Sequence, residues 1–390
     1  MTLSRTKVIE ALESRRDDFL TLDQAFAREL DDLRRGSAVL RSLTADALGD
    51  ALGGLDQAQG AFPTHEWDTT PDGAWWRPFA ADAGDTHESW RAWAMRTLTG
   101  VTTCAVDGSQ IYPSSEWSID VGAVQIGRFV NGHAKDAYSK DLHFEAIPAT
   151  DLYDAQSQDY RPRELVDLRR FETECAALTE WIEDSDAGSA RLAIFDGSLI
   201  ASFVTNPIYR ARYVAAVVRL LEASNANAVP VVGYIDASRA RDLGSMVATA
   251  RGVDPPQRVT DGVWLPRAPW GARTPAFISA RSKGLEDYGE HERSVAFLYL
   301  RASSRRRPAR LEFPRWVVEA DRTEWMTDVV RSEIVAQADG YPYAAETADA
   351  LAVLTQADRD RFHALFQEFA DRHGLDAYLS GKSASKRRRR

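Results

Sequence analysis

The sequence has little cysteine, no long apolar run and no excess of positive charge, and each lack excludes a class of protein. The only two cysteines, Cys104 and Cys175, both lie in apolar segments, so we expect two buried, reduced thiols rather than the disulfides of a secreted protein. No stretch approaches the roughly 18 apolar residues of a membrane span. Residues 1–16 are charged and lack the apolar core of a signal peptide. These features predict a cytoplasmic protein with no membrane contact.

The formal net charge of -10 excludes a protein that coats nucleic acid through overall basicity. It does not exclude a nuclease, because metal-binding carboxylates and an acidic outer surface can coexist with a locally basic channel. Several motifs are also absent from the sequence. No GxxxxGK[ST] phosphate loop, no Cys/His zinc spacing and no GxSxG elbow occurs, so neither a nucleotide-driven motor, nor a zinc protein, nor an elbow-type hydrolase is expected.

Composition divides the chain into three segments. Residues 1–98 begin with a helical pattern, whose apolar stripe fits a coiled-coil-like pair, a packing helix or an oligomer contact. They continue with a Trp-rich stretch from Phe62 to Trp93, which we interpret as packing side chains rather than as a base-stacking platform. Residues 99–375 form the main domain. Residues 376–390 form a basic tail that is expected to be disordered.

The main domain mixes strand and helix patterns. Short apolar runs alternate with longer stretches of helical periodicity, which predicts an α/β domain with a mixed central sheet flanked by helices. Its first predicted strands cover residues 102–106, 121–130, 142–148, 192–195 and 229–235, and its first predicted helices cover residues 165–182 and 209–223.

An apolar run followed by Asp-Gly-Ser occurs twice, with Asp107 and Asp196 as the aspartates. An Asp after a buried strand presents its carboxylate at the sheet edge, where ligand sites of open α/β sheets lie. Two such carboxylates can chelate Mg²⁺ or Mn²⁺, which prefer oxygen ligands. The alternative is an ordinary turn, since Asp-Gly is common after any strand. The repetition leaves both interpretations open.

Three other places can contribute to such a site. On the predicted helix, Glu174 lies beside the apolar stripe and Arg170 lies four residues before it, at the spacing of an ion pair. Near the C-terminus, Tyr341 precedes a helix that carries Asp349. Each of these residues can equally be an exposed side chain in contact with water.

Arg239 and Arg241 follow the predicted strand 229–235 and can bind a phosphate backbone. Surface arginines are common, so this assignment has an equally simple alternative.

The order of these motifs resembles that of the NurA nucleases. The resemblance rests on Val-Asp-Gly-Ser, the Arg-x-x-x-Glu helix, Phe-Asp-Gly-Ser-Leu, Val-Gly-Tyr-Ile, Phe-Leu-Tyr-Leu, Leu-Glu-Phe-Pro-Arg-Trp and Gly-Tyr-Pro-Tyr, and it covers residues 100–372. It implies a ribonuclease-H-like fold and a Mn²⁺- or Mg²⁺-dependent deoxyribonuclease. It also implies a homodimer that works with a HerA-type hexameric ATPase on DNA ends, in DNA repair or in anti-phage defence.

Carried over by position, the resemblance makes Asp107, Glu174 and Asp196 metal ligands and catalytic residues, and Tyr341 a catalytic residue. Asp349 stands where the family usually has a histidine, and a carboxylate there can still bind metal. Arg170, Arg239 and Arg241 are the candidate DNA contacts.

Two competing functions fit the same motifs. A catalytically silent, dimeric DNA-binding or motor-docking scaffold is motivated by the departure at Asp349. An aspartate-nucleophile phosphatase also places Asp after a strand, but such enzymes typically have a second Asp two residues on, and both Ser109 and Ser198 occupy that position here.

Overall fold

The computed structural model describes residues 3–81, 86–115, 117–153, 161–184, 188–281, 284–304, 306–337 and 340–377. The predicted basic tail, apart from residues 376–377, lies outside the described residues. In chain order, the elements are α1 (Arg5–Glu13), α2 (Arg16–Leu40), α3 (Ala45–Ala51), β1 (Gly60–Pro63), η1 (His65–Trp67), α4 (His87–Leu98), β2 (Val101–Ile111), β3 (Val121–Asn131), β4 (Tyr138–Pro148), α5 (Pro162–Glu183), β5 (Ala190–Asp196), α6 (Pro207–Asn227), β6 (Val231–Ile235), α7 (Asp242–Arg251), α8 (Asp261–Trp264), β7 (Phe277–Ala280), η2 (Glu286–His291), β8 (Val295–Leu300), β9 (Ala309–Pro314), α9 (Trp316–Glu319), α10 (Thr323–Gln337), α11 (Tyr343–Ala352) and α12 (Gln356–His373).

These elements form two compact units, each built from segments that are distant in the sequence. The first unit comprises Met1–Phe79, Asp236–Ser282 and Phe297–Arg310, and the second comprises the remaining segments. The predicted division at residue 98 follows composition rather than compactness, and it stays a prediction.

The second unit contains a mixed sheet, as predicted. Its strands are hydrogen-bonded in the order β9-β6-β5-β2-β3-β4. β2 and β6 both run parallel to β5, whereas β3 is antiparallel to both β2 and β4. The ribonuclease-H-like fold is a more specific assignment than a mixed sheet, and it stays a prediction.

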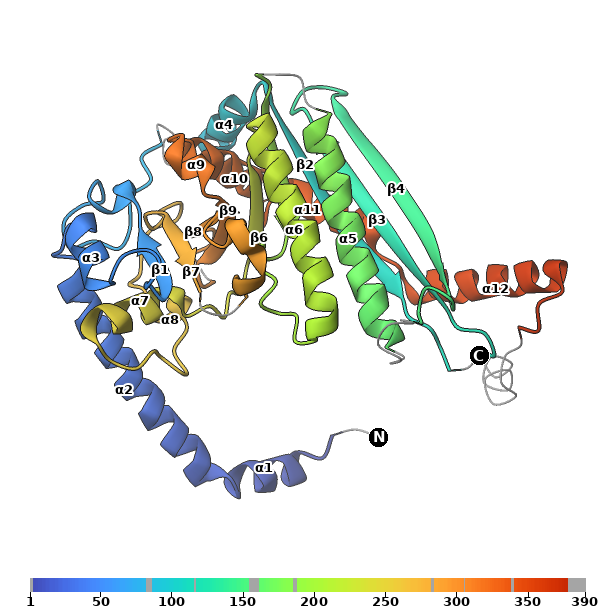
Figure 1. The fold of residues 1–390 in the computed structure, drawn as a ribbon, viewed down its shortest axis with the longest axis horizontal. Helices are drawn as coiled ribbons and strands as arrows, with labels where there is room; N and C mark the ends of the chain where they lie inside the picture. The colour runs from blue at the N-terminus through green and yellow to red at the C-terminus, as the bar shows by residue number, and fades with distance from the viewer. Residues whose placement is uncertain are drawn as a thin grey trace. The chain divides into compact units, whose positions relative to one another are not determined.

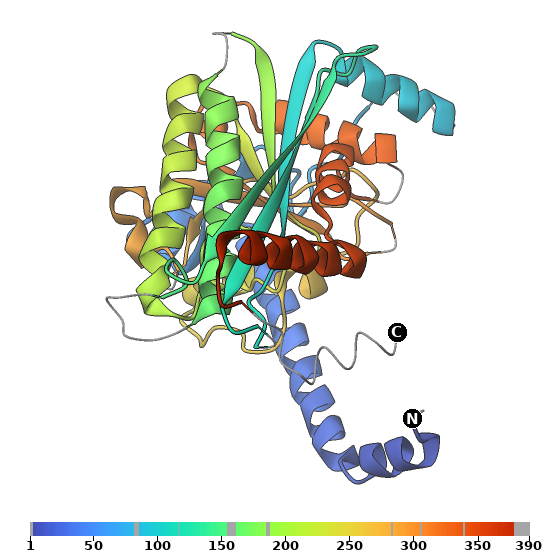
Figure 2. The same ribbon diagram turned by 90° about the vertical axis from the view of Figure 1, so that its right-hand side faces the viewer.

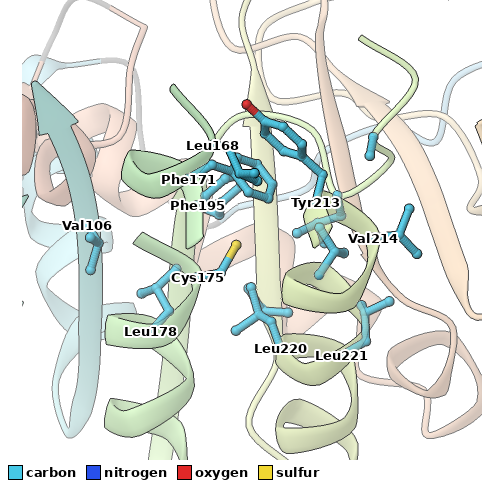
Figure 3. Close-up of a cluster of buried hydrophobic side chains, with 14 of the residues drawn as sticks. Val106, Leu168, Phe171, Cys175, Leu178, Phe195, Tyr213, Val214, Leu220 and Leu221 are labelled. Carbon is cyan, nitrogen blue, oxygen red and sulfur yellow. The ribbon is translucent and has the colours of Figure 1, made fainter. Parts of the chain in front are cut away.

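Helices cover both faces of this sheet (Figures 1 and 2). α5 and α6 lie side by side on one face, and α11 packs on β2 and β3 from the other. Between α5, α6 and the strands lies the main apolar core, where the rings of Phe171 and Phe195 meet edge to face with centroids 5.6 Å apart (Figure 3). Cys104 and Cys175 are both buried and unbonded, as expected.

The first unit has a core of its own, centred on tryptophan rings. Trp67 and Trp264 both contact Trp75 edge to face, with centroids 5.5 and 5.0 Å away. Trp67 and Trp75, both from the Trp-rich stretch, are therefore packing residues, as interpreted from the sequence. The second half of α2 packs on α7 through side chains such as Leu33, whereas Phe19 near its start is exposed.

Several strand predictions need correction. The strand β4, predicted over residues 142–148, begins at Tyr138. The strand predicted to end before Asp107 continues to Ile111, because its antiparallel pairing with β3 runs on past the Asp-Gly-Ser turn signal. β1 and β7 were not predicted, since each has only four residues and too few positions for a periodic pattern. In the part of the chain that the structure describes, no helix is long and apolar enough to cross a membrane.

Candidate metal-binding active site

The two Asp-Gly-Ser motifs lie next to each other at the end of the parallel strand pair. Val106 and Phe195 form the last parallel pair of β2 and β5, so Asp107 and Asp196 are the next residues along both strands. β5 ends at Asp196, while β2 continues against β3. The repeat in the sequence therefore places two carboxylates side by side, at the point where the parallel pairing of β2 and β5 ends.

A glycine opposite Asp107 brings α11 close to the same point. Asp107 pairs across the strands with Gly127, and paired residues present their side chains on the same face. A Cβ at Gly127 would lie 2.8 Å from the carbonyl oxygen of Ala348 in α11. The missing side chain therefore allows α11 to pack against β3 and to bring Asp349 within reach of a side-chain hydrogen bond with Asp107.

A second glycine allows α5 to approach from the opposite face. A Cβ at Gly108 would lie 2.6 Å from Glu174 Oε1 and 2.8 Å from Arg170 Cγ. Arg170 Nη1 donates to Glu174 Oε1 at 2.5 Å, in the predicted i,i+4 pair. Glu174 is only 3% exposed, so this cation partner offsets the cost of burying its charge. Arg170, predicted to contact DNA, thus pairs with a carboxylate of the site.

Tyr341 completes the cluster from the segment before α11. Its hydroxyl donates to Asp196 Oδ1, and its ring meets that of Tyr234 at a centroid distance of 4.9 Å. Tyr234, in β6, also donates from its hydroxyl to the Gly340 carbonyl oxygen at 2.8 Å. The strand next to β5 therefore fixes the segment that carries Tyr341.

Two buried acids that were not predicted as site residues, Glu312 and Glu333, hold the surrounding backbone. Glu312 of β9 accepts hydrogen bonds from the Ser198 hydroxyl at 2.7 Å and from the Leu199 N–H at 2.9 Å, which fixes the loop after Asp196. Glu333 of α10 accepts from the Ala344 N–H at 2.8 Å at the start of α11. The available signal was weak: Glu312 stands beside another charged residue, Arg310, two positions before it in β9, and Glu333 is one of several charged residues of α10.

Negative charge accumulates around Asp107. Burial, followed by the neighbouring carboxylates of Asp349 and Asp196, raises the pKa of Asp107 to about 6. Burial also raises the pKa of Glu174 to about 7, with Asp107 adding to this effect and Arg170 opposing it. Burial and the carboxylate of Asp196 hold the pKa of Tyr341 well above its usual range, so its hydroxyl stays protonated and donates.

The chemistry of this cluster fits a hard divalent cation. Asp107, Asp196 and Asp349 offer only oxygen donors, and a bound cation would relieve their mutual repulsion. Within the described residues, however, no three Asp, Glu, His or Cys side chains are grouped closely enough to hold a metal ion as they stand. Asp107 interacts with each of the other two aspartates and is therefore the centre of this carboxylate cluster.

The remaining predicted residues do not belong to this cluster. Arg239 and Arg241 are exposed and lie in the first unit, whereas all the residues of the cluster lie in the second. Arg241 donates to the carbonyl oxygen of Gln257 and precedes α7. Nothing in their surroundings adds support for a phosphate contact, and that role stays a prediction.

Comparisons with known proteins agree with this topology. The chain is similar in structure to the NurA nuclease from Sulfolobus solfataricus, at 13% identity and a TM-score of 0.51, covering 95% of this chain and 98% of that one. A NurA bound to dAMP and manganese matches at 10% identity and a TM-score of 0.46, covering 75% and 90%. Comparison with curated protein sequences finds no significant match. The NurA domain profile matches residues 101–354, well over half of the chain, and therefore the chain belongs to the NurA family.

Proposed function

We propose that this chain is a metal-dependent nuclease that hydrolyses phosphodiester bonds of DNA. The position of Asp107 beside both Asp196 and Asp349, where the parallel pairing of β2 and β5 ends, carries the proposal. Membership of the NurA family and the fold shared with the Sulfolobus nuclease support it. Mn²⁺ and Mg²⁺ both suit an all-oxygen donor set.

Each side chain of the site would have its own role in such a reaction. Asp107, with Asp196 and Asp349, would hold the metal, which when bound supplies an activated water and stabilises the leaving oxygen. The Tyr341 hydroxyl orients the carboxylate of Asp196 by donating to its Oδ1 atom. Arg170 holds Glu174 beside Gly108, and the role of Glu174 as a further metal ligand stays a prediction. No side chain is required to form a covalent bond with the substrate.

The test is cleavage of end-labelled linear DNA with Mn²⁺, Mg²⁺ or EDTA. We expect metal-dependent cutting by the wild type and its loss in both Asp107→Asn and Asp196→Asn. Asp254→Asn, at an exposed position of the first unit, serves as the matched control and is expected to cut normally. Calorimetric titration with MnCl₂ gives a readout independent of cutting, and we expect binding to the wild type and control to be lost in Asp107→Asn.

A catalytically silent scaffold is the competing function, favoured by the lack of a closed three-ligand group in the described residues. One outcome of the test is that the wild type binds DNA without cutting it, with either metal and with a HerA-type ATPase added. In that case the scaffold function replaces the nuclease function as the conclusion.

We also propose that the chain acts in the cytoplasm as a homodimer with a HerA-type ATPase hexamer, in repair or in anti-phage defence. The lack of a nucleotide-binding loop in its own sequence supports a need for a separate motor. Light scattering of the purified chain tests the dimer. ATP-dependent stimulation of cutting by an added HerA-type ATPase tests the partnership.

A further inference from the structure

A cavity of about 590 Å³ adjoins the candidate site within the second unit, on the α5 and α6 side of the sheet. It shares Glu174, Asp196 and Arg170 with that site. Small-molecule sites typically measure roughly 300–1,000 Å³. A strand whose phosphate lies at Asp196 therefore has its neighbouring sugar and base within reach of a space of suitable size.

Aromatic rings form one wall of this cavity. Phe171 and Tyr213 lie with ring centroids 4.8 Å apart (Figure 3). Phe203 meets Tyr213 edge to face at 5.6 Å and an interplanar angle of 89°. Phe203 is nevertheless 53% exposed. An exposed ring beside a buried aromatic wall is a surface on which a nucleobase can stack.

The charges of the lining disfavour a second phosphate. Among the described residues that line the cavity, four carboxylates face a single guanidinium, that of Arg170, which is already paired with Glu174. The other carboxylates are those of Glu164, Asp167 and Asp196. A phosphate would be repelled here, whereas the amino groups of a neutral base can donate to carboxylates.

The polar wall is held in a fixed arrangement. Tyr112 donates from its hydroxyl to Asp167 Oδ1 at 2.6 Å, and Gln110 donates from Nε2 to Tyr112 at 2.8 Å. About one turn before Asp167 on the same helix, α5, Glu164 accepts at Oε2 from Asn206 Nδ2 at 2.7 Å. The acceptors are thus positioned before any ligand arrives, which lowers the entropic cost of binding.

We infer that this cavity is a subsite for one unpaired nucleobase of the DNA strand, stacked on Phe203. The inference rests on the proposed nuclease function and deepens it. A base can enter only after it leaves the helical stack. The substrate is then a single-stranded or frayed end, and an intact blunt duplex binds poorly.

The test uses an intact single-stranded oligonucleotide and a series of otherwise identical strands. Each strand of the series carries one abasic residue, placed at a different position. Binding is measured by fluorescence anisotropy in EDTA, and cutting is measured separately with Mn²⁺. We expect the wild type to bind the intact strand roughly tenfold more tightly than the strand abasic at the stacked position. Phe203→Ala should bind both strands equally, whereas Phe203→Trp, which keeps a ring, should retain the preference.

Phe369→Ala is the matched control, since Phe369 is 49% exposed in α12 and lies outside the cavity lining. It should keep the wild-type preference. The subsite is overturned if no abasic position weakens wild-type binding, or if Phe203→Ala retains the full preference. Both results come from binding in EDTA and do not depend on cutting. If the protein prefers the intact strand in EDTA but never cuts DNA, the nuclease function is refuted and the base subsite is still supported.

Discussion

Tyr341 shows how a single hydroxyl can set the geometry of a carboxylate in this site. It donates to Asp196 Oδ1, while its ring is held against Tyr234. Removing a hydrogen-bond partner of a metal ligand typically costs roughly 10- to 100-fold in metal affinity or activity. We therefore expect Tyr341→Phe to weaken Mn²⁺ binding, measured by calorimetry, by a factor in that range.

Tyr343→Phe provides the control for this prediction. Tyr343 lies two residues further along, with its ring against Phe129, 5.8 Å away. This variant should bind Mn²⁺ like the wild type. Equal affinities for all three proteins would show that the Tyr341 hydroxyl does not orient a ligand.

Glu312 acts on the backbone rather than on the substrate. Glu312→Ala would leave the buried Leu199 N–H without its acceptor, and an unsatisfied buried donor costs about 1–3 kcal/mol. We expect the free energy of unfolding, measured with urea, to fall by this amount. We also expect slower cutting, because the loop after Asp196 loses its support. Glu312→Gln keeps an acceptor oxygen and should recover most of the stability.

The control for Glu312 is Glu180→Ala on α5, because the Glu180 side chain is 78% exposed. It should change the free energy of unfolding by no more than about 0.5 kcal/mol. A loss in Glu312→Ala no larger than this would mean that the Leu199 N–H finds another acceptor.

At the scale of elements, the contact between α11 and β3 brings Asp349 to Asp107. It depends on Gly127, where an added Cβ would meet the α11 backbone at 2.8 Å. A backbone carbonyl cannot rotate away as a side chain can, so Gly127→Ala should displace the helix. We expect a loss of about 1–3 kcal/mol in unfolding free energy, and a loss of Mn²⁺ affinity as Asp349 moves away from Asp107.

Gly262→Ala is the matched control, because a Cβ there meets its nearest neighbour at 3.6 Å, an ordinary contact. It lies in the helix α8, where Ala is more favourable than Gly. We expect no loss of stability and unchanged Mn²⁺ binding. If Gly127→Ala matched this behaviour, the close approach of α11 would not position Asp349.

At the scale of the whole molecule, a buried ion pair makes the stability of the first unit depend on pH. Arg273 donates to both oxygens of Glu66, at 2.6 and 2.7 Å. Burial alone would raise the pKa of Glu66, but the hydrogen bonds and charge of Arg273 outweigh it and hold the pKa below its usual range. A lowered folded-state pKa contributes stability above the unfolded pKa of about 4.3.

That contribution is lost as the pH falls below about 4.3 toward the lowered pKa of the folded state. We expect Glu66→Gln to be less stable than the wild type by about 3–5 kcal/mol at pH 7, because Arg273 is left buried without its partner. The difference should shrink as the pH is lowered below 4, and urea unfolding from pH 7 to pH 3 measures it. A difference that stays constant over this range would rule out the pair as the source.

Local patterns in the sequence determined much of the candidate site. The two Asp-Gly-Ser phrases left a carboxylate pair and two ordinary turns as alternatives, and the register of β2 and β5 places Asp107 and Asp196 side by side. Helical periodicity placed Glu174 beside the apolar face and Arg170 one turn before it, where the ion pair forms. These features were predictable because each depends on neighbours a few residues away, or on a repeated phrase whose two copies follow the last parallel pair of adjacent strands.

Other features were decided only by the tertiary structure. Asp349 reaches Asp107 because a glycine 222 positions before it, Gly127, lacks a side chain, and no local pattern encodes that distance. Glu312 and Glu333 are buried acids whose partners are distant in the sequence: Glu312 accepts from the loop after Asp196, and Glu333 accepts from Thr103 and from the Ala344 N–H. The first unit joins the chain before Phe79 to segments after Asp236. Periodicity reports which side of an element is buried, but the partner against which it is buried is set by packing over the whole chain.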